Sequence, residues 1–257
     1  MNAFYMLEQI PVLVSDTKTE KMPLVLLHGY LETHEIWNSF RELLDPDYRT
    51  IAPDLPGHGM SGTFIVNDME KQADVVYTYL KKEKIKEILL AGHSMGGYVA
   101  QAFCMKYPDM VKKLILMHSL PYPDSQEKKA ARDRDIELIR KGKLDEVAER
   151  DISLMYAPEN RIKMASVIEN TIVTAQVHEP EGIEACLKGM KNRPSYLEFL
   201  KTLPIPLHCI FGLQDHYIAP EKARETAAIL INAKVRFLKS SGHNGFLEEP
   251  LEVISFI

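Results

Sequence analysis

Short apolar runs alternate along the chain with longer stretches in which apolar residues recur at helical spacing. The run Pro23–His28 contains no polar residue before its last position, which is typical of a strand buried on both faces of a parallel sheet. Alternation of strands and helices favours parallel pairing with helices on both faces of the sheet. The pattern predicts further strands at 49–53, 87–91, 113–118, 206–211 and 235–239. It predicts helices at 35–44, 68–81, 95–107, 220–231 and from about 246 onward.

The alternation stops between Tyr122 and Tyr196. This stretch is polar and helical in character and shows no convincing strand pattern. An excursion of about 75 residues between two strands of a parallel sheet is long for a connection, and long connections are usually functional. We therefore expect one α/β domain over residues 1–257, with residues 122–196 forming a helical cap or lid.

One motif lies where a predicted strand meets a predicted helix. The segment Gly92–Gly96 has the pattern Gly-x-Ser-x-Gly, with Ser94 at its centre. A tight turn in this setting lifts the serine hydroxyl above the carboxyl end of the strand, and the glycines allow the helix to approach closely. The motif therefore predicts Ser94 as a nucleophile.

A serine hydroxyl needs an adjacent base, and the base needs a carboxylate that fixes its tautomer. His243 directly follows the last predicted strand, so it should lie at the same sheet edge as Ser94, with His118 as its strongest competitor. Asp215 follows the preceding strand and gives the chain order Ser–Asp–His that this motif uses. Asp124 is the alternative carboxylate.

Acyl transfer also requires donors for the oxyanion that forms beside the serine. The backbone N–H of Met95, the residue after the nucleophile, is the first donor that we expect. The loop after the strand at 23–28 should supply the second, and we choose the backbone N–H of Tyr30. The Tyr30 side chain could equally be only a pocket wall.

Five segments in series resemble the motifs of the α/β-hydrolase superfamily, and together they span essentially the whole chain outside 122–196. They are His28–Tyr30, Asp54–Ser61, Gly92–Gly97, Gly212–Asp215 and Ser241–His243. The resemblance implies an eight-stranded, mostly parallel sheet under a helical cap. It carries the triad roles onto Ser94, Asp215 and His243 and the oxyanion roles onto Tyr30 and Met95.

Two features depart from the family pattern. The final helix, before Ile257, is short, and the N-terminal strand region around 11–15 looks abbreviated. Neither departure touches the expected site. The chemistry that the resemblance implies requires no metal and no organic cofactor.

The composition of the chain indicates which partners to expect, but it says little about the reaction. A formal net charge of −5 with 46% hydrophobic residues gives no reason to expect nucleic acid or an anionic membrane as a partner. The cysteines Cys104, Cys186 and Cys209 are odd in number and far apart, so we expect buried reduced thiols. Neither a leader segment nor an apolar run of roughly 18 residues is recognisable, which favours a cytoplasmic protein. We expect a small-molecule substrate and leave the oligomeric state open.

A serine at the elbow favours an acyl-enzyme on an ester or thioester of a small to medium, largely apolar acid. The apolar residues Met155, Tyr156, Met164 and Ile168 could line its pocket, or they could simply pack the inserted helices together. Enzymes that hydrolyse carbon–carbon bonds share this fold and triad, and so does a menaquinone-pathway synthase. That synthase usually has an arginine where this chain has Tyr98. Ligand-binding members without turnover remain a further alternative.

Overall fold

The computed structural model describes residues 1–44 and 47–257. Its centre is an eight-stranded sheet in the order β1-β2-β4-β3-β5-β6-β7-β8. β2 pairs antiparallel with β1 and β4, and the remaining pairs are parallel. The strands are β1 (Asn2–Leu7), β2 (Ile10–Asp16), β3 (Met22–Leu27), β4 (Tyr48–Pro53), β5 (Ile88–His93), β6 (Val111–Met117), β7 (Leu207–Gly212) and β8 (Ala233–Leu238).

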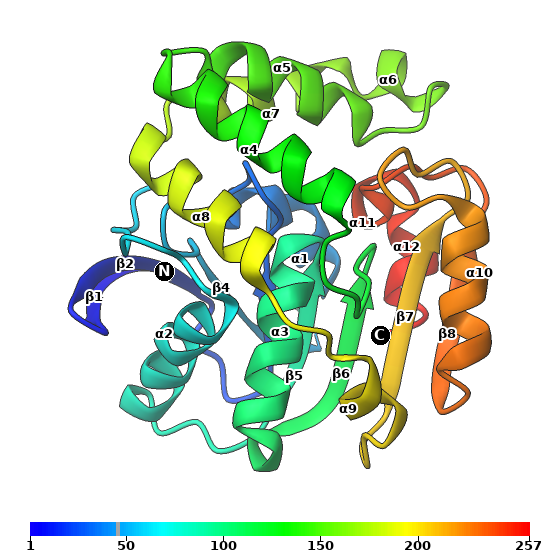
Figure 1. Ribbon diagram of the computed structural model, residues 1–257. Helices are drawn as coiled ribbons and strands as arrows, with labels where there is room; N and C mark the ends of the chain where they lie inside the picture. Colours follow the sequence, from blue (N-terminus) through cyan, green and yellow to red (C-terminus); the bar gives the residue numbers. More distant parts are fainter. Residues whose placement is uncertain (45–46) are drawn as a thin grey trace.

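Helices cover both faces of the sheet (Figure 1). One face carries α2 (Met69–Lys82), α3 (Met95–Lys106) and α10 (Pro220–Ile229). The other carries η1 (His34–Trp37), α1 (Asn38–Leu44), α11 (Gly245–Glu248) and α12 (Pro250–Ile254). The short η2 (Pro108–Met110) leads into β6. This arrangement confirms the predicted α/β-hydrolase fold class.

The unbroken apolar runs arise because each central strand faces apolar side chains on both sides. In β3, Val25 and Leu27 belong to the core under α2 and α3, whereas Leu24 and Leu26 belong to the core with Trp37. Successive side chains of a strand point to opposite faces, so both sets must be apolar. The carboxyl ends of β3, β5, β6, β7 and β8 therefore lie along one well-fixed edge.

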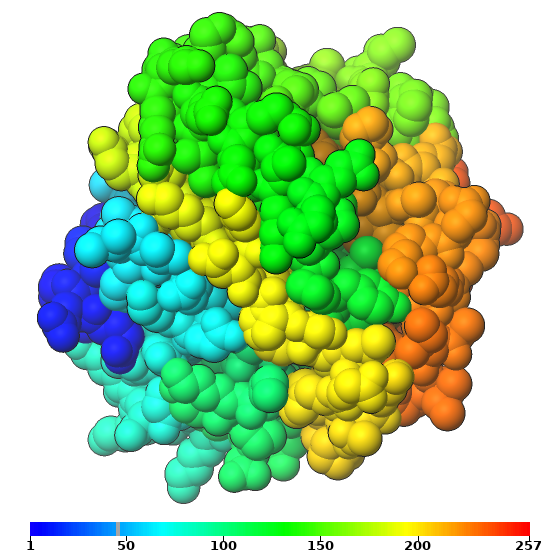
Figure 2. Space-filling view, in the orientation of Figure 1, coloured from blue at the N-terminus to red at the C-terminus, as the bar shows by residue number. Residues whose placement is uncertain are grey.

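The segment between β6 and β7 lies above that edge (Figure 1). Every residue from 122 to 196 is described, and among them there are helices and no strand. The helices are α4 (Gln126–Arg140), α5 (Leu144–Leu154), α6 (Asn160–Lys163), α7 (Ala165–Gln176) and α8 (Pro180–Asn192), and α9 (Leu197–Lys201) follows before β7. We call residues 122–196 the inserted segment. In Figure 2 its green and yellow side chains form a closely packed layer at the top of the molecule.

The N-terminal region differs from the expectation. It is not abbreviated, because β1 and β2 form an antiparallel pair that extends the sheet by two strands. At the end of the chain, two short helices replace the single one expected, with Pro250 at the first position of the second. Among the described residues, no helix combines the length and apolar character needed to cross a membrane.

The three cysteines are free and buried, as predicted. Burial raises the pKa of the Cys104, Cys186 and Cys209 thiols to about 12 in each case. These thiols therefore remain protonated and unreactive at neutral pH.

Candidate active site

Ser94 occupies a sharp turn between β5 and α3. Its backbone has φ 48° and ψ −112°, a strained conformation for a residue with a side chain. The turn requires a glycine at position 92, because a Cβ on Gly92 would lie only 2.3 Å from the Gly96 carbonyl oxygen. A side chain there would push the helix away from the strand and move the Ser94 hydroxyl.

The start of α3 also packs directly on the end of β3. A Cβ on Gly96 would lie 2.2 Å from the Leu27 carbonyl oxygen. This contact brings the loop after β3, which contains Tyr30, beside the first turn of α3. Among residues 1–44 and 47–257, no hydrogen bond uses the backbone N–H of Tyr30 or of Met95. Both N–H groups therefore have no acceptor among these residues and could donate to an oxyanion.

The structure brings Ser94, His243 and Asp215 together from three different strand ends. His243 Nε2 lies 2.8 Å from Ser94 Oγ, and His243 Nδ1 lies 2.7 Å from Asp215 Oδ2. The His243 residue is 3% exposed and Asp215 is 6% exposed, so bulk water does not compete strongly for these hydrogen bonds. This geometry fixes a proton on Nδ1 and leaves Nε2 as the acceptor for the serine hydroxyl.

Asp215 is held as a carboxylate. Burial opposes its ionisation, but His243 and then His118 outweigh that effect and keep its pKa well below the ordinary value. The backbone N–H groups of Tyr217 and Ile218 donate to its Oδ1 at 2.8 and 3.0 Å. Both oxygens are thereby fixed, so the carboxylate can only face the histidines.

A cavity of about 670 Å³ opens above Ser94 and His243. Its floor comes from the strand-edge loops and its walls from the inserted segment. Apolar side chains line much of it, namely Leu120, Leu138, Leu154, Met155, Leu187 and Met190. Its size falls within the range of roughly 300–1,000 Å³ typical of small-molecule sites.

The sequence profile of the α/β hydrolase fold matches residues 22–250. The chain belongs to the α/β-hydrolase family. Among solved structures, it is similar to a thermophilic esterase from Thermogutta terrifontis with malate bound. That similarity has a TM-score of 0.92 and 30% identity, and it covers 99% of this chain and 96% of that one.

Two curated relatives show how varied the chemistry of this α/β-hydrolase family is. A 2-hydroxy-6-oxononadienedioate/2-hydroxy-6-oxononatrienedioate hydrolase from Burkholderia vietnamiensis is 28% identical, over 91% of this chain and 85% of its own length. A pimeloyl-[acyl-carrier protein] methyl ester esterase from Citrobacter koseri is 26% identical, over 89% of this chain and 90% of its own length. The chain is therefore an α/β-hydrolase enzyme.

The competing histidine, His118, proves to be a second partner of the same carboxylate. Its Nδ1 lies 3.2 Å from Asp215 Oδ2, and its Nε2 accepts the Gly245 N–H at 3.1 Å. Burial lowers the pKa of His118 to about 4, although Asp215 acts in the opposite direction. His118 therefore stays neutral. The Gly212 N–H also lies 3.3 Å from Nδ1, but the shorter contact of the Gly245 N–H with Nε2 and the carboxylate beside Nδ1 favour the tautomer that donates its Nδ1 proton to Asp215.

The competing carboxylate, Asp124, lies elsewhere. It is buried and accepts hydrogen bonds from Arg132 and Arg193 instead of a histidine. Asp124 as the acid partner of the base is therefore wrong for this structure. Its two arginines nevertheless line the same α/β-hydrolase cavity as Ser94.

Two buried residues support His243 from behind. The ring of His93 lies 2.8 Å from the His243 carbonyl oxygen through Nε2 and 3.0 Å from Glu32 Oε2 through Nδ1. Burial acts to lower the pKa of His93, but the Glu32 carboxylate outweighs it and raises that pKa. Glu32 also accepts the Gly29 N–H at 2.7 Å, so the base loop and the Tyr30 loop share one support. The sequence offered no signal for Glu32, because a lone loop glutamate has no characteristic spacing.

The apolar residues singled out in the inserted segment have different positions. Met155 lines the cavity above Ser94. Tyr156 is buried in the hydrophobic core, Met164 packs against that core, and Ile168 lines a separate depression on the inserted segment. Only Met155 of these four lies where a ligand of this α/β-hydrolase site would contact it.

His118, Asp215 and His243 also place one ligand atom each within 4.8 Å of one another, a spacing that could surround a metal ion. Their hydrogen bonds favour a different use. Both Nδ1 atoms face one carboxylate oxygen at proton-sharing distance, and His118 Nε2 already accepts a backbone N–H. This donor set suits proton positioning better than metal ligation.

Proposed function

We propose that the protein is a serine hydrolase that cleaves carboxylic esters or thioesters through an acyl-enzyme on Ser94. The observation that carries this proposal is the continuous chain of short contacts from Ser94 Oγ through His243 to Asp215 Oδ2. The similarity to the Thermogutta terrifontis esterase over 99% of this chain supports the same class of reaction.

In this mechanism Ser94 Oγ attacks the carbonyl carbon while its proton moves to His243 Nε2. The carbonyl oxygen becomes an oxyanion that the N–H groups of Tyr30 and Met95 stabilise. When the carbonyl re-forms, the bond to the leaving group breaks, and His243 donates its proton to that group. A water molecule then gives a proton to His243 and attacks the acyl carbon. As this second intermediate collapses, the bond to Ser94 Oγ breaks, His243 returns the proton to Ser94 Oγ, and the acid is released. Asp215 stays ionised throughout and stabilises the imidazolium.

The inserted segment would act as the cap of this site. Covering the cavity excludes water and strengthens the hydrogen bonds to the oxyanion. The apolar walls favour an acyl group of small to medium size.

The test is covalent labelling followed by turnover. A fluorophosphonate probe should label Ser94 in the wild-type protein and nothing in Ser94→Ala. Hydrolysis of p-nitrophenyl esters should fall by about 10⁴–10⁶ in Ser94→Ala and in His243→Ala, since triad members act as a unit. More than a tenth of the wild-type rate in either purified variant, or no labelling of the wild type, would refute the proposal and favour a ligand-binding protein.

Carbon–carbon bond hydrolysis is the second candidate, because the Burkholderia vietnamiensis relative is named for an oxo-dienedioate substrate. The same triad would serve it. Comparing kcat/KM for a ring-fission diketone and for a p-nitrophenyl ester distinguishes the two. Faster turnover of the diketone would replace the ester proposal.

A further inference from the structure

The cavity contains a buried charge cluster that the triad does not use. Asp124 Oδ1 accepts from Arg193 Nη1 at 2.7 Å, and Arg132 Nε donates to its Oδ2. Arg193 comes from the end of the inserted segment and Arg132 from α4, and both line the cavity above Ser94. Two guanidinium groups share one carboxylate, so the cluster carries a net charge of about +1.

Arg193 has a donor without a partner. Its side chain is only 3% exposed, yet its buried Nε–H meets no acceptor among the residues that the structure describes. Tyr30 and Tyr122 line the same cavity, and their hydroxyl groups are likewise buried without a hydrogen-bond partner among the described residues. A charged donor left unsatisfied in a buried site is costly, so these groups favour a ligand that supplies acceptor oxygens.

A second charged network lines the same cavity. Arg150 donates to Asp151 at 2.6 Å and to Asp135 at 2.9 Å, so one arginine serves two carboxylates and this network carries a formal net charge of about −1. The positive charge therefore belongs to the Asp124 cluster. A single carboxylate would neutralise that cluster, whereas the nearby Asp135 and Asp151 carboxylates disfavour a more highly charged anion such as a phosphate dianion.

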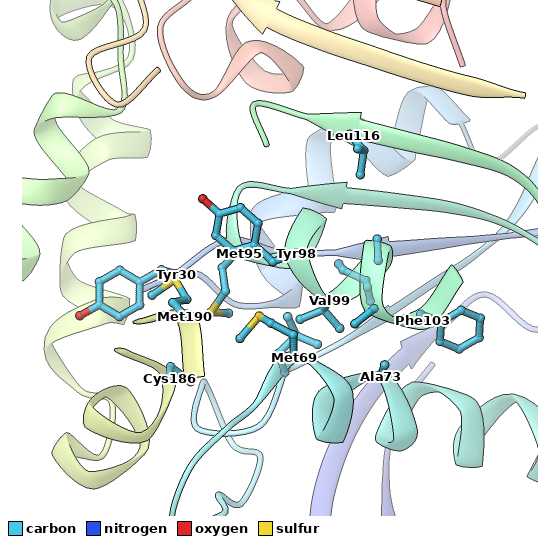
Figure 3. Close-up of a cluster of buried hydrophobic side chains, with 14 of the residues drawn as sticks. Tyr30, Met69, Ala73, Met95, Tyr98, Val99, Phe103, Leu116, Cys186 and Met190 are labelled. Atoms are coloured by element: carbon cyan, nitrogen blue, oxygen red, sulfur yellow. The ribbon is translucent and has the colours of Figure 1, made fainter. Parts of the chain in front are cut away.

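The Asp124 cluster lies beside Tyr98 of α3. The Arg193 guanidinium stacks on Tyr98, 3.9 Å from the ring centroid. Tyr98 is four residues beyond Ser94 in α3, about 6 Å along the helix axis. The leaving group must lie near His243, which protonates it and whose ring neighbours Tyr217 at 5.1 Å. Figure 3 shows Tyr98, Tyr30 and Met190 around the start of α3 and along α8, a wall that the acyl chain would follow.

We infer that Arg193 and Arg132 form a subsite for a carboxylate at the far end of the acyl chain, so that the preferred substrates are half-esters of dicarboxylic acids. This inference rests on the proposed ester hydrolysis. The apolar walls would contact the methylene chain, and the carboxylate would meet the Arg193 Nε–H. Tyr98 holds the guanidinium in place by stacking.

The experiment compares two esters that differ only in the distal charge. They are mono-p-nitrophenyl adipate, which keeps a free carboxylate, and its methyl-capped analogue, which does not. Release of p-nitrophenolate is measured near pH 7.5 after subtraction of the uncatalysed rate. The variants are Arg193→Gln, Tyr122→Phe and, as a surface control on α10, Arg224→Gln. A fluorophosphonate titration counts competent sites in each preparation.

The wild type should prefer the charged ester by at least about tenfold in kcat/KM, the usual value of one hydrogen bond to a charged group. Arg193→Gln should lower kcat/KM for the charged ester by at least about tenfold more than for the capped ester, and Arg224→Gln should change neither. Glutarate should inhibit competitively and inorganic phosphate should not. Equal rates for the two esters in the wild type, equal losses of both in Arg193→Gln, or inhibition by phosphate alone would overturn the subsite.

The two proposals fail separately. If neither ester turns over and the probe does not label Ser94, the proposed function is refuted. Calorimetric titration with glutarate then still tests the subsite. Binding that Arg193→Gln removes would support it, and absence of binding would refute it. Tyr122→Phe deletes only one hydroxyl and keeps the proposal testable even if Arg193→Gln fails to fold. A smaller loss of the preference for the charged ester in Tyr122→Phe would support the subsite. An unchanged preference in this variant would count against the subsite.

Discussion

Acidification should weaken the attachment of the inserted segment to the sheet through His178. This residue is 4% exposed, and its Nδ1 accepts the Gly59 N–H at 3.3 Å, a bond that requires the neutral ring. Its ring lies 5.3 Å from that of His58, which in turn lies 5.1 Å from that of His28. The three rings form a column from the inserted segment to the end of β3.

The magnitude follows from the titration of His178. Burial, with a further contribution from His28, lowers its pKa from 6.5 to about 4, and Asp54 acts in the opposite direction. A histidine with a lowered pKa binds more protons when unfolded, so stability is lost as the pH falls below 6.5 and the loss is complete below about 4. A shift of about 2.5 units corresponds to about 3.4 kcal/mol, of which about 2 kcal/mol is reached near pH 5.

The assay is urea unfolding of the wild type and of His178→Asn near pH 7.5 and near pH 5. Asparagine can accept the Gly59 N–H and does not titrate. The free energy of unfolding should therefore fall by about 2 kcal/mol less in the variant than in the wild type. The exposed His216, changed to Asn, serves as the control. Identical pH dependence in His178→Asn and the wild type would refute the reasoning.

Further predictions concern the site itself. Asp215→Asn should lower kcat by roughly 10²–10⁴-fold, because the base then adopts a poorer tautomer, and a larger loss in Asp124→Asn would contradict the assignment. His118→Asn should lower kcat by about tenfold in steady-state ester kinetics with little change in KM, and a change confined to KM would argue against a positioning role. Gly96→Ala should reduce both thermal stability and kcat, since its Cβ would lie 2.2 Å from a backbone carbonyl of β3; wild-type values for both would contradict that close packing. Met155→Glu should change the preference among acyl chain lengths while Ser94 still reacts with a small fluorophosphonate, and an unchanged profile would remove Met155 from the acyl pocket.

The parts of the fold that the sequence predicted well are those in which both faces of a strand are buried. Such strands must be apolar at every position, so β3, β5 and β7 are visible as runs. β1 was missed because it is an edge strand whose Phe4 and Met6 are exposed, and its burial alternates. Only its pairing with β2 makes it a strand.

The candidate site was likewise predicted only in part. Ser94, Asp215 and His243 follow predicted strands, so the geometry of a parallel sheet brings them to one edge. The Asp124–Arg193 pair joins residues 69 positions apart, one of them beyond five helices, and no local pattern encodes that meeting. The spacing of residues along the chain likewise does not predict that two histidines share the Asp215 carboxylate.

The junction between the base loop and the inserted segment constrains how this protein can be re-engineered. The His243 N–H donates to the Met155 carbonyl at 2.6 Å, and Glu248 accepts the N–H groups of both Gly242 and Ala157 at 2.8 Å. The inserted segment is thus bonded to the backbone that carries the base, so this corner cannot swing open as a free lid. A chimaera that exchanges the inserted segment for that of a relative has to exchange residues 242–248 with it. The two have to be exchanged together, although 45 residues and two strands separate them in the chain.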